Sequence, residues 1–516
     1  MNKSKDDFIS SISKGYQPEG ESISLGVPLF ENVLLPEVSI KLPLKTFNRH
    51  GLIAGATGTG KTKTLQVLAE NLSEKGIPVL LMDIKGDLSG LGALGKESSA
   101  LQERATKMGL KHVPKAFFIE LLSLSNEKGA KLRATVSEFG PVLFSKILGI
   151  NETQSSIVTI LFKYCDDKGL PLLDLKDFKK TLQFLSEEGK AELEKEYGKF
   201  STASSSIILR KIIELEQQGG DAFFGEYSFE TDDLLRKNSN GEGIISIIRL
   251  TDIQDKPMLF STFMLCLLAE IYSTFPEQGD QDKPKLVIFI DEAHLIFDEA
   301  SKALLNQLET IIKLIRSKGV GIFFCTQTPT DIPADILGQL GLKIQHALRA
   351  FTAKDRKNIK LTAENYPLTD FYETEEIITS LGIGEALITG LNEKGIPTPL
   401  VAMCMKAPSS RMDVLSEQEI NDIVQQSKLI AKYNQIIDRE SAYEILNNRI
   451  ENKIQQETPK ATKSKPVEKE EESTFEKVIE SPLGKEVTRT ITRELTRGLL
   501  GVLGISTTKR RTKGWF

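Results

Sequence analysis

The sequence is poor in the residues that build disulfide scaffolds and metal clusters. It has four cysteines and four scattered histidines among 516 residues, with no CxxC or CxxH pair. The cysteines are Cys165, Cys266, Cys325 and Cys404. Because they stand far apart in apolar surroundings, a buried free thiol is the expected state. This pattern argues against a disulfide framework or a zinc site and favours a reducing compartment.

Long apolar runs are also missing. The most apolar stretch, residues 258–269, has twelve residues and stops at Glu270. A membrane-spanning helix needs about 20 such residues. The N-terminal residues lack the apolar centre of a signal peptide. These features predict a cytoplasmic protein with no integral membrane segment.

The chain as a whole also lacks an excess of positive charge. The chain has 66 Lys and Arg against 71 Asp and Glu, a net charge of −5, which excludes a protein that coats nucleic acid with its whole surface. Basic residues instead gather at the end. Residues 481–516 hold eight basic and two acidic residues, a net +6 that leaves −11 for residues 1–480.

Within this end segment, two stripes recur every four residues. The basic stripe is Lys485, Arg489, Arg493 and Arg497, and the apolar stripe is Val487, Ile491, Leu495 and Leu499. One interpretation is docking on DNA phosphates or anionic lipid. The other is a helix that packs on the protein's own body through the apolar stripe. Since no aromatic residue lies between the basic ones, the second is favoured.

Alternating strand and helix patterns predict an α/β fold with a mostly parallel sheet. This core is expected over 48–96 and 236–405, interrupted at 97–235 by a mainly helical insertion. The remaining segments are predicted to be a short N-terminal β segment (1–47), C-terminal helices (406–455), a disordered linker (456–474) and a basic amphipathic tail (475–516).

Residues 55–62 match the phosphate-loop motif G-x-x-x-x-G-K-[ST] without a mismatch. They are Gly55, Ala56, Thr57, Gly58, Thr59, Gly60, Lys61 and Thr62. The motif lies between an expected strand and an expected helix, where glycines let backbone N–H groups surround a phosphate. Lys61 would bridge the β- and γ-phosphates of ATP, and Thr62 would place its hydroxyl on Mg²⁺.

A second expected strand, 285–291, ends in Asp291, and a second carboxylate, Glu292, follows it. The carboxyl end of a central parallel strand opens onto the ligand crevice. We expect Asp291 to hold Mg²⁺ and Glu292 to be the base that deprotonates the attacking water. The alternative is that both acids cap the helix that begins at Ala293. Two acids after a strand favour hydrolysis by water over a kinase reaction.

Two further strand ends carry polar residues. Gln327 follows the strand 321–326, where it could sense the γ-phosphate and position water, or could simply be a polar surface residue. The segment DIKGD, 83–87, follows the strand after the phosphate loop. It is either near the nucleotide or a neighbouring subunit, or a turn that needs Gly86 at positive φ.

Taken together, these segments resemble the HerA/FtsK superfamily of RecA-like ATPases, and specifically the bacterial HerA-like proteins of the YjgR type. The resembling segments are NRHGLIAGATGTGKT (48–62), LLMDIKGDLSG (80–90), TVSEFGP (135–141), LVIFIDEAHLIF (286–297), IRSKGVGIFFCTQTPTDIP (315–333) and SPLGKEVTRTITRELTRGLLGVLG (481–504). The resemblance implies a RecA-like core and a homo-hexameric ring in which hydrolysis of ATP is linked to movement or processing of double-stranded DNA.

In such rings an arginine from the next subunit completes the site by neutralising charge on the γ-phosphate. The candidates are Arg49, Arg349 and Arg316, and a surface salt bridge is the alternative for each. Archaeal HerA proteins carry a β-barrel domain before the ATPase, for which too few residues precede the loop here. A nuclease partner is therefore possible but not supported by the sequence. The alternative function is a nucleotide-gated scaffold or slow ATPase that binds protein or membrane partners.

Overall fold

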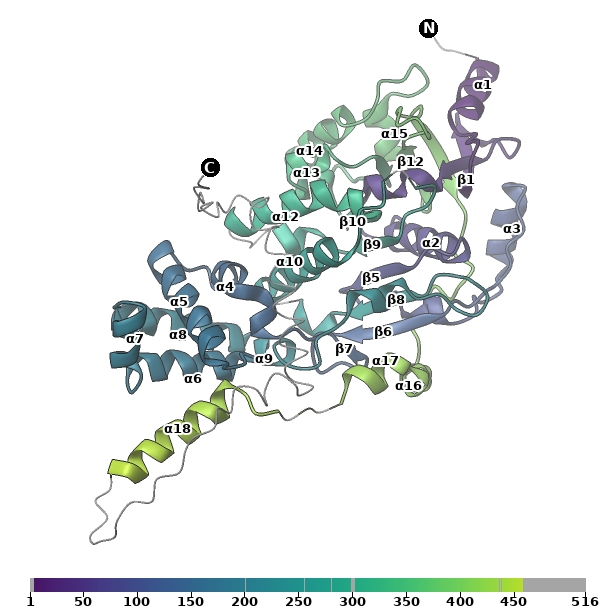
Figure 1. The fold of residues 1–516 in the computed structure, drawn as a ribbon. Coiled ribbons are helices and arrows are strands. Elements are labelled where there is room, and N and C mark those ends of the chain that lie inside the picture. Colours follow the sequence, from purple (N-terminus) through teal and green to yellow (C-terminus); the bar gives the residue numbers. More distant parts are fainter. Residues whose placement is uncertain are drawn as a thin grey trace, which may run out of the picture. The chain divides into compact units, whose positions relative to one another are not determined.

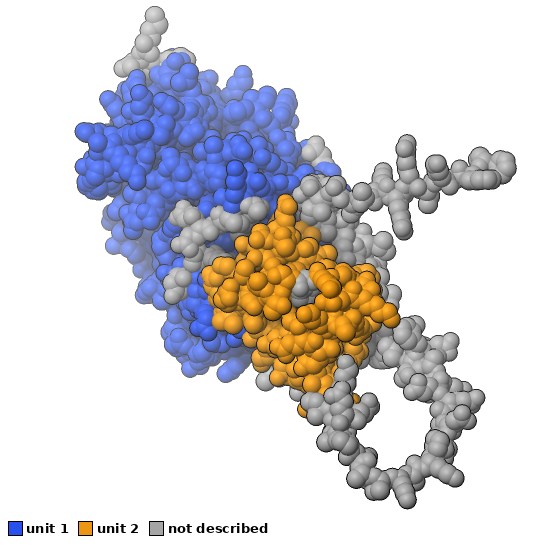
Figure 2. All heavy atoms as spheres, turned by 90° about the vertical axis from the view of Figure 1, so that its left-hand side faces the viewer, with its two compact units in different colours: residues 1–134, 215–437 blue, residues 135–214, 438–516 orange. Residues whose placement is uncertain are grey.

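The chain divides into two compact units, coloured separately in Figure 2. Unit 1 comprises residues 1–134 and 215–437, and unit 2 comprises residues 135–214 and 438–516. The computed structural model describes residues 4–199, 201–254, 256–279, 281–297, 302–435, 437 and 439–457. The expected linker from residue 458 onward and the basic tail lie outside these residues.

Unit 1 is built on a mixed sheet that has thirteen strands among the described residues, in the order β2-β1-β13-β12-β11-β4-β10-β9-β5-β8-β6-β7, with β3 paired to β1. The strands are β1 (Ser22–Phe30), β2 (Val33–Leu34), β3 (Ile40–Pro43), β4 (Gly51–Ala54), β5 (Val79–Asp83), β6 (Ile119–Ser123), β7 (Ala130–Lys131), β8 (Ile245–Arg249), β9 (Leu286–Ile290), β10 (Val320–Thr326), β11 (Leu342–Gln345), β12 (Glu385–Thr389) and β13 (Val401–Met405). Figure 1 shows the central strands β10, β9, β5, β8 and β6.

Neighbouring strands from β11 to β7 in this order run parallel. Every residue of β4, β5, β9 and β10 is buried, which explains why these strands read as unbroken apolar runs. Past β11 the sheet continues antiparallel through β12, β13 and β1. The N-terminal strands therefore extend the main sheet, and the prediction of an α/β fold with a mostly parallel sheet is confirmed.

Helices of unit 1 flank this sheet. They are α1 (Lys5–Gly15), α2 (Lys61–Glu74), α3 (Ser99–Lys107), α9 (Gly220–Phe223), α10 (Pro257–Thr274), α11 (His294–Phe297), α12 (Lys302–Ile315), α13 (Ala334–Leu337), α14 (Ala353–Glu364), α15 (Thr374–Ser380), α16 (Glu417–Gln426) and α17 (Lys428–Tyr433). Leu65 and Leu68 of α2 share one apolar cluster with Leu81 of β5 and Phe289 of β9. The cluster fixes α2, and with it the phosphate loop, on the sheet.

Unit 2 is helical over the described residues. It contains α4 (Val136–Ile147), α5 (Glu152–Lys168), α6 (Leu175–Ser186), α7 (Lys190–Glu196), most of α8 (Thr202–Gln217) and α18 (Ala442–Glu457). Three helices begin with a capping box, at Thr135, Asn151 and Asp174. The rings of Phe144 and Phe178 pack 4.8 Å apart, centroid to centroid, in its core.

Two segments far apart in the sequence make up this unit. Asp177 of α6 accepts hydrogen bonds from the hydroxyl of Ser441, at 2.5 Å, and the backbone N–H of Tyr443, at 2.9 Å. The start of α18 is thereby held on α6. Residues 97–134, part of the expected helical insertion, lie in unit 1 and contribute α3, β6 and β7. None of the described helices has the length and apolar character that a membrane crossing requires.

Candidate functional site

Four neighbouring strand ends form the candidate site. Strands β4, β10, β9 and β5 are adjacent and parallel, so their carboxyl ends meet at one edge of the sheet. The phosphate-loop motif follows β4, and Gln327 follows β10. Asp291 follows β9, and the DIKGD segment begins at Asp83, the last residue of β5. The topology thus brings together four segments that lie between residues 55 and 327 of the sequence.

The loop between β4 and α2 is held by its neighbours on the sheet. The N–H of Gly55 donates to the carbonyl of Gln327 at 3.2 Å, and the N–H of Ala56 donates to the carbonyl of Ala347 at 2.9 Å. Gly55, Gly58 and Gly60 have φ values of +154°, +79° and +116°. A side chain is strained at each of these positions. The loop therefore needs its glycines to adopt this path.

Lys61 begins α2 and turns its side chain back over the loop. Its Nζ donates to the carbonyl of Ala56 at 3.2 Å, and the residue is only 6% exposed. Burial lowers the pKa of Lys61. Thr62 follows in the first turn of the helix, where backbone N–H groups have no partner within the helix. This helix end can receive an anion.

The two carboxylates after β9 are both buried. Asp291 is 2% exposed and Glu292 is 5% exposed. Burial raises the pKa of Asp291, and the neighbouring Glu292 adds to the rise. Asp291 Oδ2 is buried and has no hydrogen-bond partner within the described residues. Glu292 has φ +46°, a left-handed backbone conformation that is rare for a residue with a side chain.

The DIKGD segment forms a turn at the same edge. Asp83 accepts hydrogen bonds from the backbone N–H groups of Gly86, at 2.7 Å, Asp87, at 3.1 Å, and Leu88, at 3.0 Å. Burial raises the pKa of Asp83 to about 7. The turn directs Lys85 at Glu292, with which its Nζ forms an ion pair. The sequence shows a lysine within the DIKGD segment, but it does not show that this lysine contacts Glu292.

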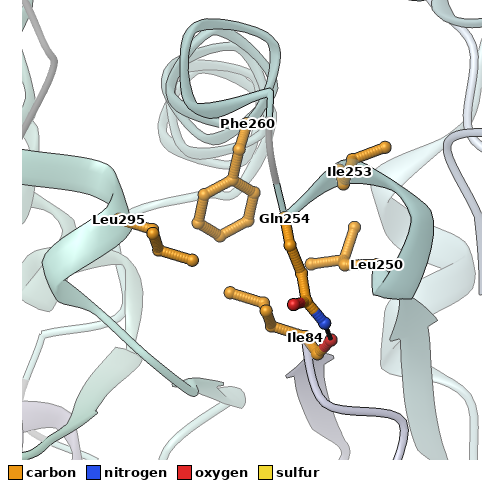
Figure 3. Close-up of a pocket in the computed structure, with 6 residues that line it drawn as sticks. All are labelled: Ile84, Leu250, Ile253, Gln254, Phe260 and Leu295. Atoms are coloured by element: carbon orange, nitrogen blue, oxygen red, sulfur yellow. Dashed lines mark hydrogen bonds between the residues drawn. The ribbon is translucent and has the colours of Figure 1, made fainter.

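A small pocket lies beside this ion pair. It is lined by Ile84, Leu250, Ile253, Gln254, Phe260 and Leu295, which face one another in Figure 3. Gln254 Nε2 donates to the carbonyl of Ile84 at 2.6 Å. Ile84 stands next to Lys85 in the chain, and Leu295 stands next to His294. The pocket is therefore lined by apolar residues from both of these polar segments. The apolar lining suits it to anchoring these segments more than to binding a charged ligand.

Sequence reasoning missed His346, which lies just after β11. Its Nε2 is 2.9 Å from Thr64 Oγ1 on α2, and its Nδ1 is 2.8 Å from the carbonyl of Glu385. A Cβ on Gly55 would lie only 2.5 Å from the Cβ of His346. Burial lowers the pKa of His346 to about 4, so the ring is neutral near pH 7. The imidazole is thus part of the support of the phosphate loop.

The donor set suits a metal ion that retains several waters. Within the described residues, no group of three or more His, Cys, Asp or Glu side chains could hold a metal ion. Mg²⁺ commonly takes one or two protein oxygens and fills its remaining positions with water and phosphate. The unpartnered Oδ2 of Asp291, at the same edge as the Thr62 hydroxyl, fits that requirement.

The remaining candidates lie at two opposite edges of the sheet. Gln327 and Arg349 follow β10 and β11 at the carboxyl edge, and both side chains are exposed. Arg49 precedes β4 and Arg316 precedes β10, which places them at the amino edge. The structure therefore brings Lys61, Asp291 and Glu292 together. It does not bring Arg49 or Arg316 to the phosphate loop of their own chain.

Comparison with known proteins gives consistent matches. The family described as helicase HerA-like C-terminal matches residues 32–510. The DNA double-strand break repair helicase HerA of Saccharolobus solfataricus is 24% identical over 391 residues, which cover 75% of this chain and 69% of that protein. The HerA helicase of Sulfolobus acidocaldarius is 22% identical over 366 residues, which cover 70% of this chain and 66% of that protein.

Two solved structures have the same fold. The plasmid coupling protein TrwB in complex with the ATP analogue ADPNP has a TM-score of 0.51 at 14% identity, covering 77% of this chain and 98% of that one. TrwB in complex with ADP and Mg²⁺ has a TM-score of 0.50 at 14% identity, covering 77% and 99% of the two chains. At this level of identity the likeness concerns the fold alone.

Proposed function

This chain belongs to the helicase HerA-like C-terminal family, and we propose that it is an Mg²⁺-dependent ATP hydrolase that acts as a ring-forming motor on double-stranded DNA. The observation that carries the proposal is the meeting of Lys61, Asp291 and Glu292, all buried, at the carboxyl edge of one parallel sheet. The HerA relatives are named as helicases of DNA double-strand break repair, which favours DNA as the substrate.

In this proposal the triphosphate of ATP lies over the loop from Gly55 to Thr62. The backbone N–H groups of the loop and the first turn of α2 point at the β-phosphate, and the helix dipole favours the anion. Lys61 approaches the β- and γ-phosphates. Thr62 and Asp291 would hold Mg²⁺, which neutralises phosphate charge when bound.

Glu292 is the proposed general base. Its carboxylate takes a proton from a water molecule as the water oxygen attacks the γ-phosphorus. The bond between the γ-phosphorus and the bridging oxygen breaks, so that ADP and inorganic phosphate form. Gln327, next to the loop at the end of β10, would orient that water and sense the γ-phosphate.

A ring would complete the site from a second subunit. Arg49 and Arg316 lie at the amino edge of the sheet, so any contact of theirs with a γ-phosphate must occur in the neighbouring subunit's site. Arg349 is exposed at the carboxyl edge, beside the loop of its own chain. We propose a homo-hexamer in the cytoplasm, in which one of these arginines acts across the interface. A partner nuclease has no specific support from the described residues.

Hydrolysis measured with and without duplex DNA tests the motor. We expect DNA to stimulate phosphate release, and the stimulation to fade between 50 and 200 mM salt, with roughly a hundredfold or greater loss of DNA affinity if several phosphates are contacted. Hydrolysis that is indifferent to DNA would favour the nucleotide-gated scaffold instead. Particle imaging with a non-hydrolysable ATP analogue and a short duplex would reveal the ring and its size.

A further inference from the structure

The proposed base does not stand free in the site. One oxygen of the Glu292 carboxylate forms an ion pair with Lys85 Nζ. The other oxygen lies 3.3 Å from Nδ1 of His294. Glu292 is therefore faced on both oxygens by nitrogen atoms. The side chain of Glu292 is 7% exposed and that of Lys85 is 41% exposed, so the carboxylate is enclosed and the lysine reaches solvent.

Lys85 is aimed by a rigid turn. Three backbone N–H groups that follow it in the chain are bound by the carboxylate of Asp83. On the preceding side, Gln254 Nε2 bonds the carbonyl of Ile84, and the Ile84 side chain lines the apolar pocket of Figure 3. The backbone on both sides of Lys85 is thus fixed, and the flexible part is the lysine side chain itself.

Glu292 is likewise held in an unusual conformation. Its backbone φ of +46° is costly for a residue that has a Cβ, and such conformations persist where the surroundings enforce them. A general base needs a free lone pair at the water that it deprotonates. The Lys85 ammonium occupies a lone pair of one Glu292 oxygen. It also stabilises the negative charge that the carboxylate loses when it takes up a proton. The ion pair therefore makes Glu292 a poorer proton acceptor, and the carboxylate acts best as a base when the pair is open.

We propose that Lys85 is a positioning residue that holds the Glu292 carboxylate out of action until a triphosphate is bound. This inference rests on the proposed function, because it assigns a partner to the proposed base. The terminal phosphate, placed by Lys61 at the same sheet edge, offers Lys85 a competing anion. When Lys85 moves to that phosphate, Glu292 is released to take the proton of water. Hydrolysis thereby becomes dependent on a fully occupied site.

The test compares Lys85→Met and Lys85→Arg chains by steady-state hydrolysis without DNA. Lys85→Met keeps the length of the side chain but removes its charge. In the ATP-bound chain Lys85 is shared between the terminal phosphate and Glu292, so the base is still engaged for part of each cycle. We expect the kcat of Lys85→Met to rise about threefold or more because this engagement is lost, and its KM for ATP to rise because the phosphate loses a cation. Lys85→Arg keeps the ion pair, and its kcat should stay close to that of the unmodified chain.

The matched control is Lys283→Met. Lys283 also pairs with a glutamate, Glu21, at 2.7 Å, and its side chain is 37% exposed, but it precedes β9 at the opposite sheet edge. This variant should hydrolyse ATP as the unmodified chain does. A kcat of Lys85→Met that equals the control, or that falls, overturns the proposal. If Lys85→Met does not fold, Lys85→Gln takes its place, and the same kcat comparison decides.

Failure of this inference is distinguishable from failure of the proposed function. Unmodified protein that releases no phosphate from ATP would refute both. Active protein that is inactivated by Glu292→Gln but not accelerated by Lys85→Met would refute only the role of Lys85. A Lys85→Met/Glu292→Gln chain should be as inactive as Glu292→Gln alone, because the lysine is proposed to act through the glutamate.

Discussion

The imidazole of His346 joins two parts of the molecule through Thr64, whose hydroxyl oxygen lies 2.9 Å from Nε2. Thr64 is one turn into the helix that follows the phosphate loop, and His346 follows the neighbouring parallel strand β11. The other ring nitrogen faces the carbonyl of Glu385, the first residue of β12. The antiparallel extension of the sheet is thus connected to the loop that we propose as the nucleotide site.

This arrangement predicts a pH dependence of stability. Burial lowers the pKa of His346 to about 4 from an ordinary value of 6.5. The unfolded chain therefore binds the proton more tightly than the folded chain does. The contribution of His346 to the free energy of unfolding is fully present above pH 6.5 and is lost as the pH falls towards 4. Between pH 7 and pH 5 this one histidine should remove roughly 2 kcal/mol from the free energy of unfolding.

Urea titrations of unmodified and His346→Gln protein at pH 7 and pH 5 measure that contribution. Glutamine does not titrate, so the variant should lose less stability on acidification. His50, whose pKa burial also lowers to about 4, is present in both proteins and cancels from the comparison. An identical loss in the two proteins would show that His346 is not held neutral in the folded chain.

The phosphate loop should tolerate alanine unequally at two glycines. Gly55→Ala places a Cβ 2.5 Å from the Cβ of His346, whereas a Cβ on Gly58 has no heavy atom within 4 Å. Both positions have positive φ, so both variants carry a backbone cost on the order of 1–3 kcal/mol. Only Gly55→Ala must also displace the phosphate loop, because its added methyl group would overlap His346. Titration with a fluorescent ATP analogue should show about tenfold or greater loss of affinity for Gly55→Ala relative to Gly58→Ala. Equal affinities would contradict this.

Glu292→Gln separates binding from hydrolysis. The amide keeps the shape of the side chain but cannot take a proton, so we expect phosphate release to fall by about 10²–10⁴-fold. Calorimetry should still detect ATP binding. A variant that hydrolyses ATP at the normal rate would remove Glu292 from the role of base.

Mixed rings test the arginines. Arg49→Ala and Lys61→Ala chains should each be inactive alone. In equal mixtures, about one quarter of the interfaces in a head-to-tail ring would pair an intact Lys61 with an intact Arg49. Activity near that fraction identifies Arg49 as the residue acting across the interface. If no mixing ratio restores hydrolysis, the same mixtures with Arg316→Ala and Arg349→Ala decide between the other two candidates.

The parallel core could be predicted because its strands carry their signal locally. Strands such as β5 and β9 are buried on both faces and read as unbroken apolar runs, and the loop after β4 has a motif of eight residues. The residues that follow a strand in a parallel sheet share an edge. For that reason, the motif and the strand ends together could place Lys61, Asp291 and Glu292 at one edge of the sheet, while their roles stay predictions.

The missed features depend on contacts between distant segments. The pairing of Lys85 with Glu292 joins residues about 200 positions apart, and the contact of His346 with Thr64 spans 282 positions. Neither has a local pattern. Likewise, nothing in the composition of residues 439–457 indicates that they pack with 135–214, where the buried carboxylate of Asp177 binds Ser441 and Tyr443. Tertiary contacts of this kind have no periodicity in the sequence.

The central claim is that a triphosphate binds at the carboxyl edge of the sheet through the phosphate loop. Titration of ATP with Mg²⁺ into the full chain in a calorimeter tests it most directly, with Lys61→Ala as the control. We predict a saturable heat at one site per chain, and its loss in the variant, since the lysine charge at the phosphates is removed. No heat from folded, unmodified protein, or the same heat from both proteins, would contradict the account.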